Sequence, residues 1–261
     1  LANNRHAEQT LAATTETQRL LVDELHRLIP PDEGQAAWQA GGIWFRTYYP
    51  PEQNHPVFAR LRDSPLGAPE ILIDGNRRAQ NHPFYNLEGI QLNRDLSHLV
   101  FAEDFTGERL FILSVLDLNT GRILSDRIEG AEPLTAWASD NRTFYYIRPD
   151  PVSLRPCRVF RHQLGTDPRM DLLVHEEPDP EFRCYLTRTR NWSHILIHAY
   201  SSDTEDIHLI DPQGGSPRAV PLTPRRRGHE FDLEWAGDRF IIRTNWNAPN
   251  FRICEAFPGE S

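Results

Sequence analysis

A polar turn that leads into a short apolar strand recurs four times along the chain. The turns are centred on Asp95, Asp140, Asn191 and Gly237, at steps of 45, 51 and 46 residues. Apolar and aromatic residues follow each turn, as in residues 99–102 after the first. A period of about 45 residues built from short strands is typical of a β-propeller, in which each repeat forms one four-stranded antiparallel blade. The pattern therefore predicts an all-β fold.

The strands of this propeller are expected over residues 41–261. The clearest apolar runs are residues 43–49, 57–61, 70–74, 99–102, 110–118, 122–124, 240–243 and 250–256. Turns rich in glycine, which adopts positive φ easily, are expected at residues 119–121, 164–168 and 211–215. The last repeat stops after two recognisable strands, so we expect about four and a half blades. Closed propellers have about four to eight complete blades.

The first 40 residues differ from the rest and are expected to form an N-terminal helical segment. Residues 5–29 have the pattern of an amphipathic helix, which Pro30 and Pro31 end. Its leucines recur at helical intervals, with charged residues between them: Leu11, Leu20, Leu21, Leu25 and Leu28. This stripe needs a partner surface. The helix packs either on the propeller itself or on a domain outside this sequence.

Composition restricts the kinds of partner. The formal net charge is −9, and all 28 basic residues are arginines. An acidic chain disfavours nucleic acid, because its phosphates attract basic surfaces. The run Arg225-Arg226-Arg227 is expected to be a solvated loop rather than a binding patch. No apolar run approaches the roughly 20 residues of a membrane helix, so a membrane is not expected as a partner either.

Cysteine usage indicates a reducing compartment. Cys157, Cys184 and Cys254 are odd in number, widely spaced and without a CxxC pair. Such cysteines are typical of free thiols rather than of a disulfide framework. We therefore expect a cytoplasmic protein.

Two segments that superficially suggest catalysis or metal binding do not fit that chemistry. In Gly214-Gly215-Ser216-Pro217-Arg218 the last glycine of a nucleophile turn is replaced, and Pro217 lacks the N–H that an oxyanion hole requires. This segment is expected to be a hairpin turn. His194 and His198 flank a strand pattern, and on a strand they would lie about 13 Å apart, too far for one ion.

The carboxylates do not form an obvious acid/base pair. Glu103-Asp104 and Glu176-Glu177 are adjacent in the sequence, and adjacent strand residues face opposite ways. With Asp179, most of these side chains are expected to be solvated, or to pair with another domain. The sequence therefore predicts no catalytic, cofactor-binding or metal-binding residue, and no cofactor.

A set of motifs, taken in order, resembles the propeller of the oligopeptidase B group in the prolyl oligopeptidase family of serine peptidases. They are Phe101-Ala102-Glu103-Asp104, Asp117-Leu118-Asn119-Thr120-Gly121, and residues 137–146, 158–166, 176–179 and 244–252, with the tyrosine-containing segment 81–89 before them. The resemblance covers nearly the whole chain.

The resemblance implies a seven-bladed propeller that caps an α/β-hydrolase domain, with the N-terminal helix packed on that domain. It implies that the propeller admits only short peptides, cleaved after Arg or Lys, and that charged residues form a latch between the two domains. Glu103, Asp104 and Arg127 are our latch candidates, because they lie at strand ends in the best-matched blade.

The sequence stops in the fifth blade, so the catalytic serine, aspartate and histidine correspond to no residue here. These residues alone are expected to be inactive, either as part of a longer enzyme or as a natural truncation. The expected partners are the hydrolase domain and the remaining blades. The alternative is a non-enzymatic binding module, whose exposed blade edges could pair with a partner or with a second copy. A propeller enzyme with a central metal is disfavoured by the histidine spacing.

Overall fold

The computed structural model describes residues 2–29, 34–210 and 218–257, and the chain divides into two compact units, Leu1–Asn76 and Arg77–Ser261. No helix in these described ranges is both long and apolar enough to cross a lipid bilayer. The division into residues 1–40 and 41–261 stays a prediction.

The first unit contains the N-terminal helices and one sheet. The helices are α1 (Ala2–Leu11), the 3₁₀ turn η1 (Ala12–Thr14) and α2 (Thr15–Leu28). The sheet, blade I, has the antiparallel order β1 (Trp38–Ala40), β2 (Ile43–Tyr48), β3 (Val57–Leu61) and β4 (Pro69–Asp74), and the short helix α3 (Gly75–Arg78) follows it. Strand β1 starts before residue 41, where strands were predicted to begin. Three residues are too few to show a period in the sequence.

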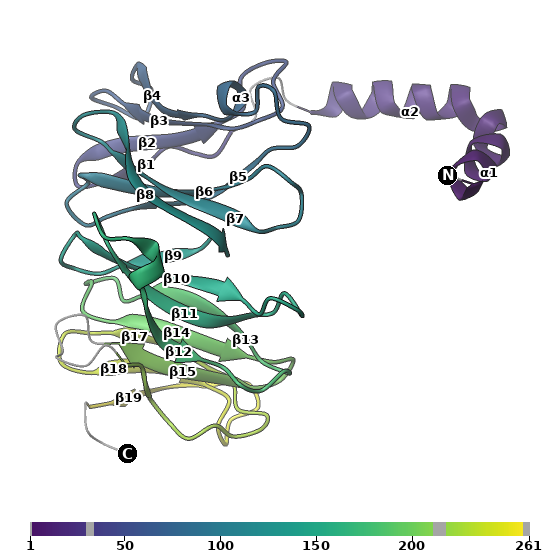
Figure 1. The fold of residues 1–261 in the computed structure, drawn as a ribbon. Coiled ribbons are helices and arrows are strands. Elements are labelled where there is room, and N and C mark those ends of the chain that lie inside the picture. The colour runs from purple at the N-terminus through teal and green to yellow at the C-terminus, as the bar shows by residue number, and fades with distance from the viewer. Residues whose placement is uncertain (1, 30–33, 211–217, 258–261) are drawn as a thin grey trace. The chain divides into compact units, whose positions relative to one another are not determined.

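The N-terminal helical segment is confirmed, and the short 3₁₀ turn η1 divides the helix predicted over residues 5–29 into α1 and α2 (Figure 1). The hydroxyl of Thr14 donates to the carbonyl oxygen of Leu11, and that of Thr15 donates to the carbonyl oxygen of Ala12. Threonine hydroxyls compete in this way with the regular helical hydrogen bonds.

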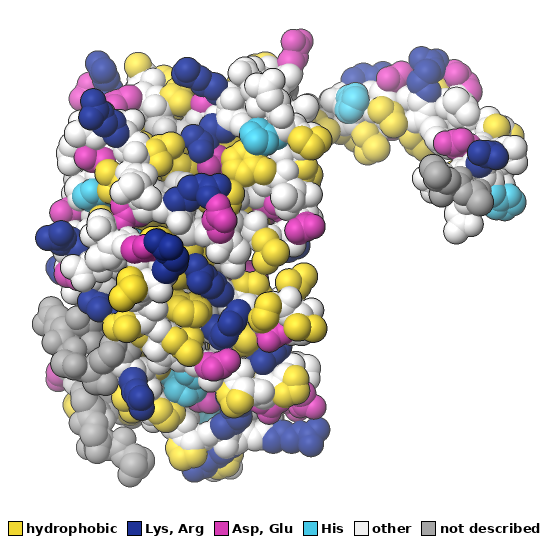
Figure 2. Space-filling view, in the orientation of Figure 1, with side chains coloured by type: hydrophobic (Ala, Val, Ile, Leu, Met, Phe, Trp, Pro, Cys, Tyr) yellow, Lys and Arg dark blue, Asp and Glu magenta, His cyan; other side chains and the backbone are white. Residues whose placement is uncertain are grey.

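The amphipathic character of α2 is confirmed. Figure 2 shows hydrophobic side chains gathered along one side of α2 and charged side chains along the other. None of the residues of α2 is buried, and Leu25 and Leu28 are 59% and 73% exposed. The helix therefore presents a continuous leucine stripe.

The second unit contains four sheets, each an antiparallel meander. Blade II has β5 (Asn86–Leu92), β6 (His98–Asp104), β7 (Phe111–Asp117) and β8 (Arg122–Ala131). Blade III has β9 (Thr135–Trp137), β10 (Thr143–Pro149), β11 (Pro156–Gln163) and β12 (Leu172–Glu176), with the 3₁₀ turn η2 (Pro168–Met170) before β12. Blade IV has β13 (Arg183–Arg188), β14 (Ile195–Tyr200), β15 (Glu205–Ile210) and β16 (Val220–Pro221). Blade V has three described strands, β17 (Phe231–Trp235), β18 (Phe240–Thr244) and β19 (Arg252–Ala256).

The predicted four complete blades and part of a fifth are therefore confirmed. In Figure 1, blades II to V follow one another in chain order, each facing the next. The turn predicted at residues 211–215, and the hairpin turn predicted around Ser216, lie outside the described residues.

Apolar side chains fill the seams between the blades of the second unit. Phe111 of blade II packs with Trp137 and Phe144 of blade III in one cluster. On β14, Ile195 faces blade III whereas Leu196 faces blade V, since neighbouring strand residues point to opposite faces. Inner strands are thus buried on both faces, which explains their long apolar runs.

The four recurrent turns are confirmed, and they meet at one end of the second unit, here called the turn end. The carboxylate of Asp95 accepts a hydrogen bond from the backbone N–H of Ser97 at 3.0 Å, as Asx turns require. Asn141 bridges to the preceding blade, because its Oδ1 accepts from the N–H of Asp95 and its carbonyl accepts from Asn93. Between blades IV and V, the backbone N–H of Arg190 donates in a similar way to the carboxylate of Glu234.

Candidate functional site

The end of the second unit opposite the turn end holds two buried networks of arginine and carboxylate side chains. The first is centred on Glu103 near the end of β6, which is 1% exposed. Arg78 donates to both of its carboxylate oxygens, from Nε to Oε1 and from Nη2 to Oε2, the latter at 2.6 Å. The hydroxyl of Tyr85 donates to Oε1 at 2.9 Å.

This geometry fixes the protonation of the donors. The hydrogen bond to Glu103 raises the pKa of Arg78. Burial, with the neighbouring Glu103 carboxylate, raises the pKa of the Tyr85 hydroxyl. A two-pronged arginine–carboxylate pair of this kind is among the strongest charged hydrogen bonds in proteins. Glu103 is therefore held by two residues of the segment that precedes β5.

Asp104 and Arg127, the other two latch candidates, lie apart from that pair. Asp104 accepts hydrogen bonds from the backbone N–H groups of Thr106, Gly107 and Arg109 at 2.8–3.0 Å. Burial raises the pKa of Asp104, but these N–H groups outweigh it and lower the pKa. Arg127 lies in the middle of β8 and not at a strand end as predicted; it pairs with Glu129, and its side chain is 53% exposed. The structure does not bring the three candidates into one cluster, and their role as a latch stays a prediction.

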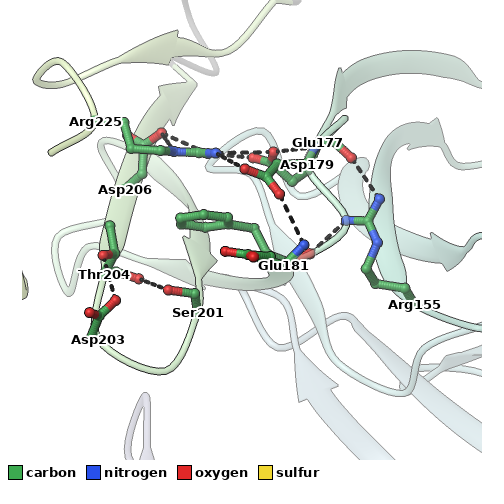
Figure 3. Close-up of polar contacts among 10 residues, drawn as sticks. Arg155, Glu177, Asp179, Glu181, Ser201, Asp203, Thr204, Asp206 and Arg225 are labelled. Atoms are coloured by element: carbon green, nitrogen blue, oxygen red, sulfur yellow. Dashed lines mark hydrogen bonds and ion pairs between the residues drawn. The ribbon is translucent and has the colours of Figure 1, made fainter. Parts of the chain in front are cut away.

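The second network joins three elements around Arg225 (Figure 3). Its guanidinium donates to Glu177, with Nη2 2.5 Å from Oε2, and to Asp206, with Nε 3.2 Å from Oδ2. It also lies 3.8 Å from the ring centre of Phe182, within cation–π range. Arg225 lies in the connection between β16 and β17, which links blades IV and V. Glu177 lies in the connection between β12 and β13, which links blades III and IV. The ion pair between them therefore ties two successive inter-blade connections together.

Glu177 is the centre of the second network. It is 2% exposed. Burial raises the pKa of Glu177, but the hydrogen bond from Arg225 lowers it below the ordinary value. Arg155, between β10 and β11, donates to the backbone carbonyls of Glu177 and Phe182 at 3.0 and 2.6 Å. The prediction that most of the paired carboxylates are solvated is wrong, because Glu103, Asp104 and Glu177 are each at most 2% exposed.

A cavity of about 210 Å³ opens beside this network at the same end. Its lining combines aromatic rings, hydroxyls and carboxylates: Tyr185, Tyr200, Ser201, Ser202, Asp203, Thr204, Glu205 and Glu230. The hydroxyl of Tyr185 donates to Glu205 at 3.0 Å. Concave surfaces lined by one sign of charge focus the field, so this cavity attracts cationic groups.

The two histidines weighed as metal ligands have separate structural roles. His198 on β14 contacts Glu205 at 2.7 Å and stacks on Tyr185. His194 packs against the rings of Trp235 and Phe240 of blade V. Within the described ranges, no group of three or more His, Cys, Asp or Glu side chains is arranged to hold a metal ion.

The sequence did not identify the arginines of the two networks, Arg78 and Arg225, as partners of the buried carboxylates. The run Arg225-Arg226-Arg227 lies in an exposed connection, as predicted, but the pairing of the Arg225 side chain with Glu177 and Asp206 was not predicted. Arg78 and Tyr85 were not singled out. Their partners lie 25 and 18 residues away along the chain, so no local spacing could have identified these pairs.

The chain belongs to the family described as prolyl oligopeptidase, N-terminal beta-propeller domain, whose model matches residues 1–258. Among characterised relatives, it is 29% identical to dipeptidyl aminopeptidase BI of Pseudoxanthomonas mexicana, over 98% of this chain and 37% of that protein. It is 25% identical to protease 2 of Moraxella lacunata, over 96% of this chain and 37% of that protein. The chain thus spans little more than a third of the length of these relatives.

Solved structures agree on the fold. Oligopeptidase B from Leishmania major superposes with a TM-score of 0.88 at 21% identity, over 97% of this chain and 36% of that one. Oligopeptidase B from Trypanosoma brucei, in a closed form with covalently bound antipain, gives a TM-score of 0.87 at 20% identity. The described blades therefore share the fold of the N-terminal propeller in these structures.

Proposed function

We propose that this chain is the gating propeller of an oligopeptidase B-like serine peptidase, which controls access of short peptides to a hydrolase domain. The observation that carries the proposal is the family match over residues 1–258, combined with coverage of only about 37% of peptidase relatives. The catalytic residues of such an enzyme would come from the rest of the protein.

Cleavage after Arg or Lys is part of the same proposal. It is what the resemblance of the ordered sequence motifs to the oligopeptidase B group implies. The acidic cavity bounded by Asp203, Glu205 and Glu230 is compatible with the passage of cationic peptides, because opposite charges steer association.

The experiment uses the complete protein and three peptides that are identical except at one central position, which is Arg, Lys or Gln. Mass spectrometry identifies the cut sites. We expect cleavage after Arg and Lys and none after Gln. Efficient cleavage after Gln would contradict a preference for basic residues, and removal of dipeptides from the N-terminus of all three peptides would indicate an aminopeptidase instead.

The latch remains a proposal for Glu103, Asp104 and Arg127. Since Glu103 is satisfied by Arg78 and Tyr85 in this structure, a latch role requires it to exchange partners when the domains close. Charge reversal in Glu103→Lys is expected to change both peptide cleavage and domain closure in the complete enzyme, measured by steady-state kinetics and small-angle scattering. Unchanged values for both would remove Glu103 from the latch, and Glu108→Lys on the neighbouring exposed loop is the control.

A cytoplasmic location is likewise proposed. The three cysteines are free, which supports a reducing compartment. Cell fractionation with an antibody to the complete protein tests it.

A further inference from the structure

Two histidines from adjacent blades face each other across the seam between blades III and IV. His175 on β12 pairs with Val159 of β11, and His208 on β15 pairs with Ile197 of β14. Val159 and Ile197 both belong to the apolar core of this seam. Directly paired residues point to the same face of a sheet, so both imidazoles point into the seam, where their ring centroids lie 4.4 Å apart.

The facing rings are not bonded to each other through their buried nitrogens. Nε2 of His175 and Nδ1 of His208 are buried and have no hydrogen-bond partner among the described residues, and the same holds for Oδ1 of Asp206. Buried polar atoms are normally paired. The unpaired buried nitrogens favour the neutral imidazoles, because an unpaired buried charge costs far more than an unpaired neutral group.

The charges around the pair act on its protonation in both directions. The titratable and charged groups that face this seam from the packed elements are Glu177, Asp206, Arg225, Arg155, Cys157 and Cys184. The Glu177 and Asp206 carboxylates favour a charged imidazole and the Arg225 guanidinium disfavours one, although Arg225 also donates to both carboxylates. Burial lowers the pKa of His175 to about 4, and His208 and Arg225 add to this effect. Burial also lowers the pKa of His208.

We propose that the seam between blades III and IV is a proton-sensitive joint of the propeller. At neutral pH the two imidazoles are uncharged and pack ring against ring. Protonation puts two positive charges face to face beside Arg225 and separates β12 from β15. The joint opens locally, and the apolar seams between blades II and III and between blades IV and V stay closed.

The pH window follows from linkage. An imidazole exposed by opening has its ordinary pKa of 6.5, whereas that of His175 in the closed seam is about 4. The seam is therefore fully stable above about pH 6.5 and loses stability as the pH falls from 6.5 towards 4. Between pH 7 and 5, His175 alone raises the opening equilibrium about 20-fold.

Amide hydrogen exchange of the complete protein at pH 7 and pH 5 tests the joint, with rates converted to protection factors to remove the intrinsic pH dependence of exchange. Protection of amides in β12 and β15 is expected to fall at least 20-fold on acidification, while that in β6 and β7 is unchanged. This comparison lies within the wild-type protein and needs no variant. Equal pH dependence in both pairs of strands would overturn the proposal.

The double variant His175→Gln/His208→Asn keeps polar groups of similar shape but cannot be protonated. Its β12 and β15 amides are expected to lose the pH dependence between pH 7 and 5. His26→Gln, on the exposed face of α2, is the matched control and should behave as wild type. A double variant that keeps the full 20-fold change would show that other groups open the seam.

Discussion

At the scale of single residues, Arg225 pairs with two buried carboxylates at once. It donates to Glu177 and Asp206, which are 2% and 5% exposed. We expect Arg225→Ala to lower the free energy of unfolding by about 3 kcal/mol, because removing one partner leaves the other charge buried and unpaired. Urea denaturation of the purified chain measures this. Arg227→Ala, two residues further in the same arginine run, is the control and should cost less than about 0.5 kcal/mol.

The folded structure shifts the pKa values of His162 and His175 in opposite directions: that of His162 is raised and that of His175 is lowered. His162 is fully buried, with Nδ1 2.8 Å from Asp171 and Nε2 3.0 Å from Asp126 of the preceding blade. Burial alone would lower the pKa of His162, but hydrogen bonds to the two carboxylates outweigh it and raise the pKa to about 9.

The His162 contribution to stability is therefore complete below about pH 6.5 and disappears as the pH rises through 9. The difference in unfolding free energy between wild type and His162→Gln is expected to be about 3 kcal/mol larger at pH 6 than at pH 9.5. Urea denaturation at both pH values gives this difference. A difference that is constant with pH would mean that His162 is neutral in the folded chain.

What the sequence could predict at this scale was limited to local chemistry. Asp95 and Asn191 were recognisable as turn residues because their partners lie two residues away. Glu177 and Arg225 are 48 residues apart and become neighbours only when blades III and IV stack. A charge pair that forms only when blades stack has no characteristic spacing by which a single sequence could reveal it.

At the scale of elements, Trp137 joins the inner strands of two blades. It is 1% exposed on β9, and its indole N–H donates to the carbonyl of Gln91 on β5 at 3.0 Å. We expect Trp137→Phe to cost about 2 kcal/mol, because it leaves a small cavity and an unpaired buried carbonyl. Urea denaturation followed by circular dichroism measures it. Trp246→Phe, at a 38% exposed position, should be close to neutral.

Elements with a clear period were predictable and short ones were not. The run 57–61 coincides with β3, and 240–243 lies within β18, because apolar residues there fill both faces of a blade. Strand β16 has two residues, and β1 has three, so neither could show alternation. The interruption of the N-terminal helix at η1 depends on two threonine hydroxyls, which a hydrophobic pattern does not register.

At the scale of the whole molecule, the propeller fold was predicted from the regular spacing of the four turns. Steps of 45, 51 and 46 residues between turns were enough to indicate stacked blades, because each blade buries its faces only against its neighbours. The same logic explains why no catalytic group could be assigned. The blades provide packed seams and paired charges at one end, and the proposed gating function assigns them no step of bond cleavage.

The most direct test of a gating propeller is the dependence of cleavage on substrate size. The complete protein is given a short peptide with one Arg, and the same sequence inserted into an exposed loop of a stable carrier protein, and kcat/KM is measured for both. The gating account predicts that the free peptide is cut after Arg and the carrier remains intact, although trypsin cuts both. Comparable cleavage of the carrier, or an intact free peptide, would contradict it.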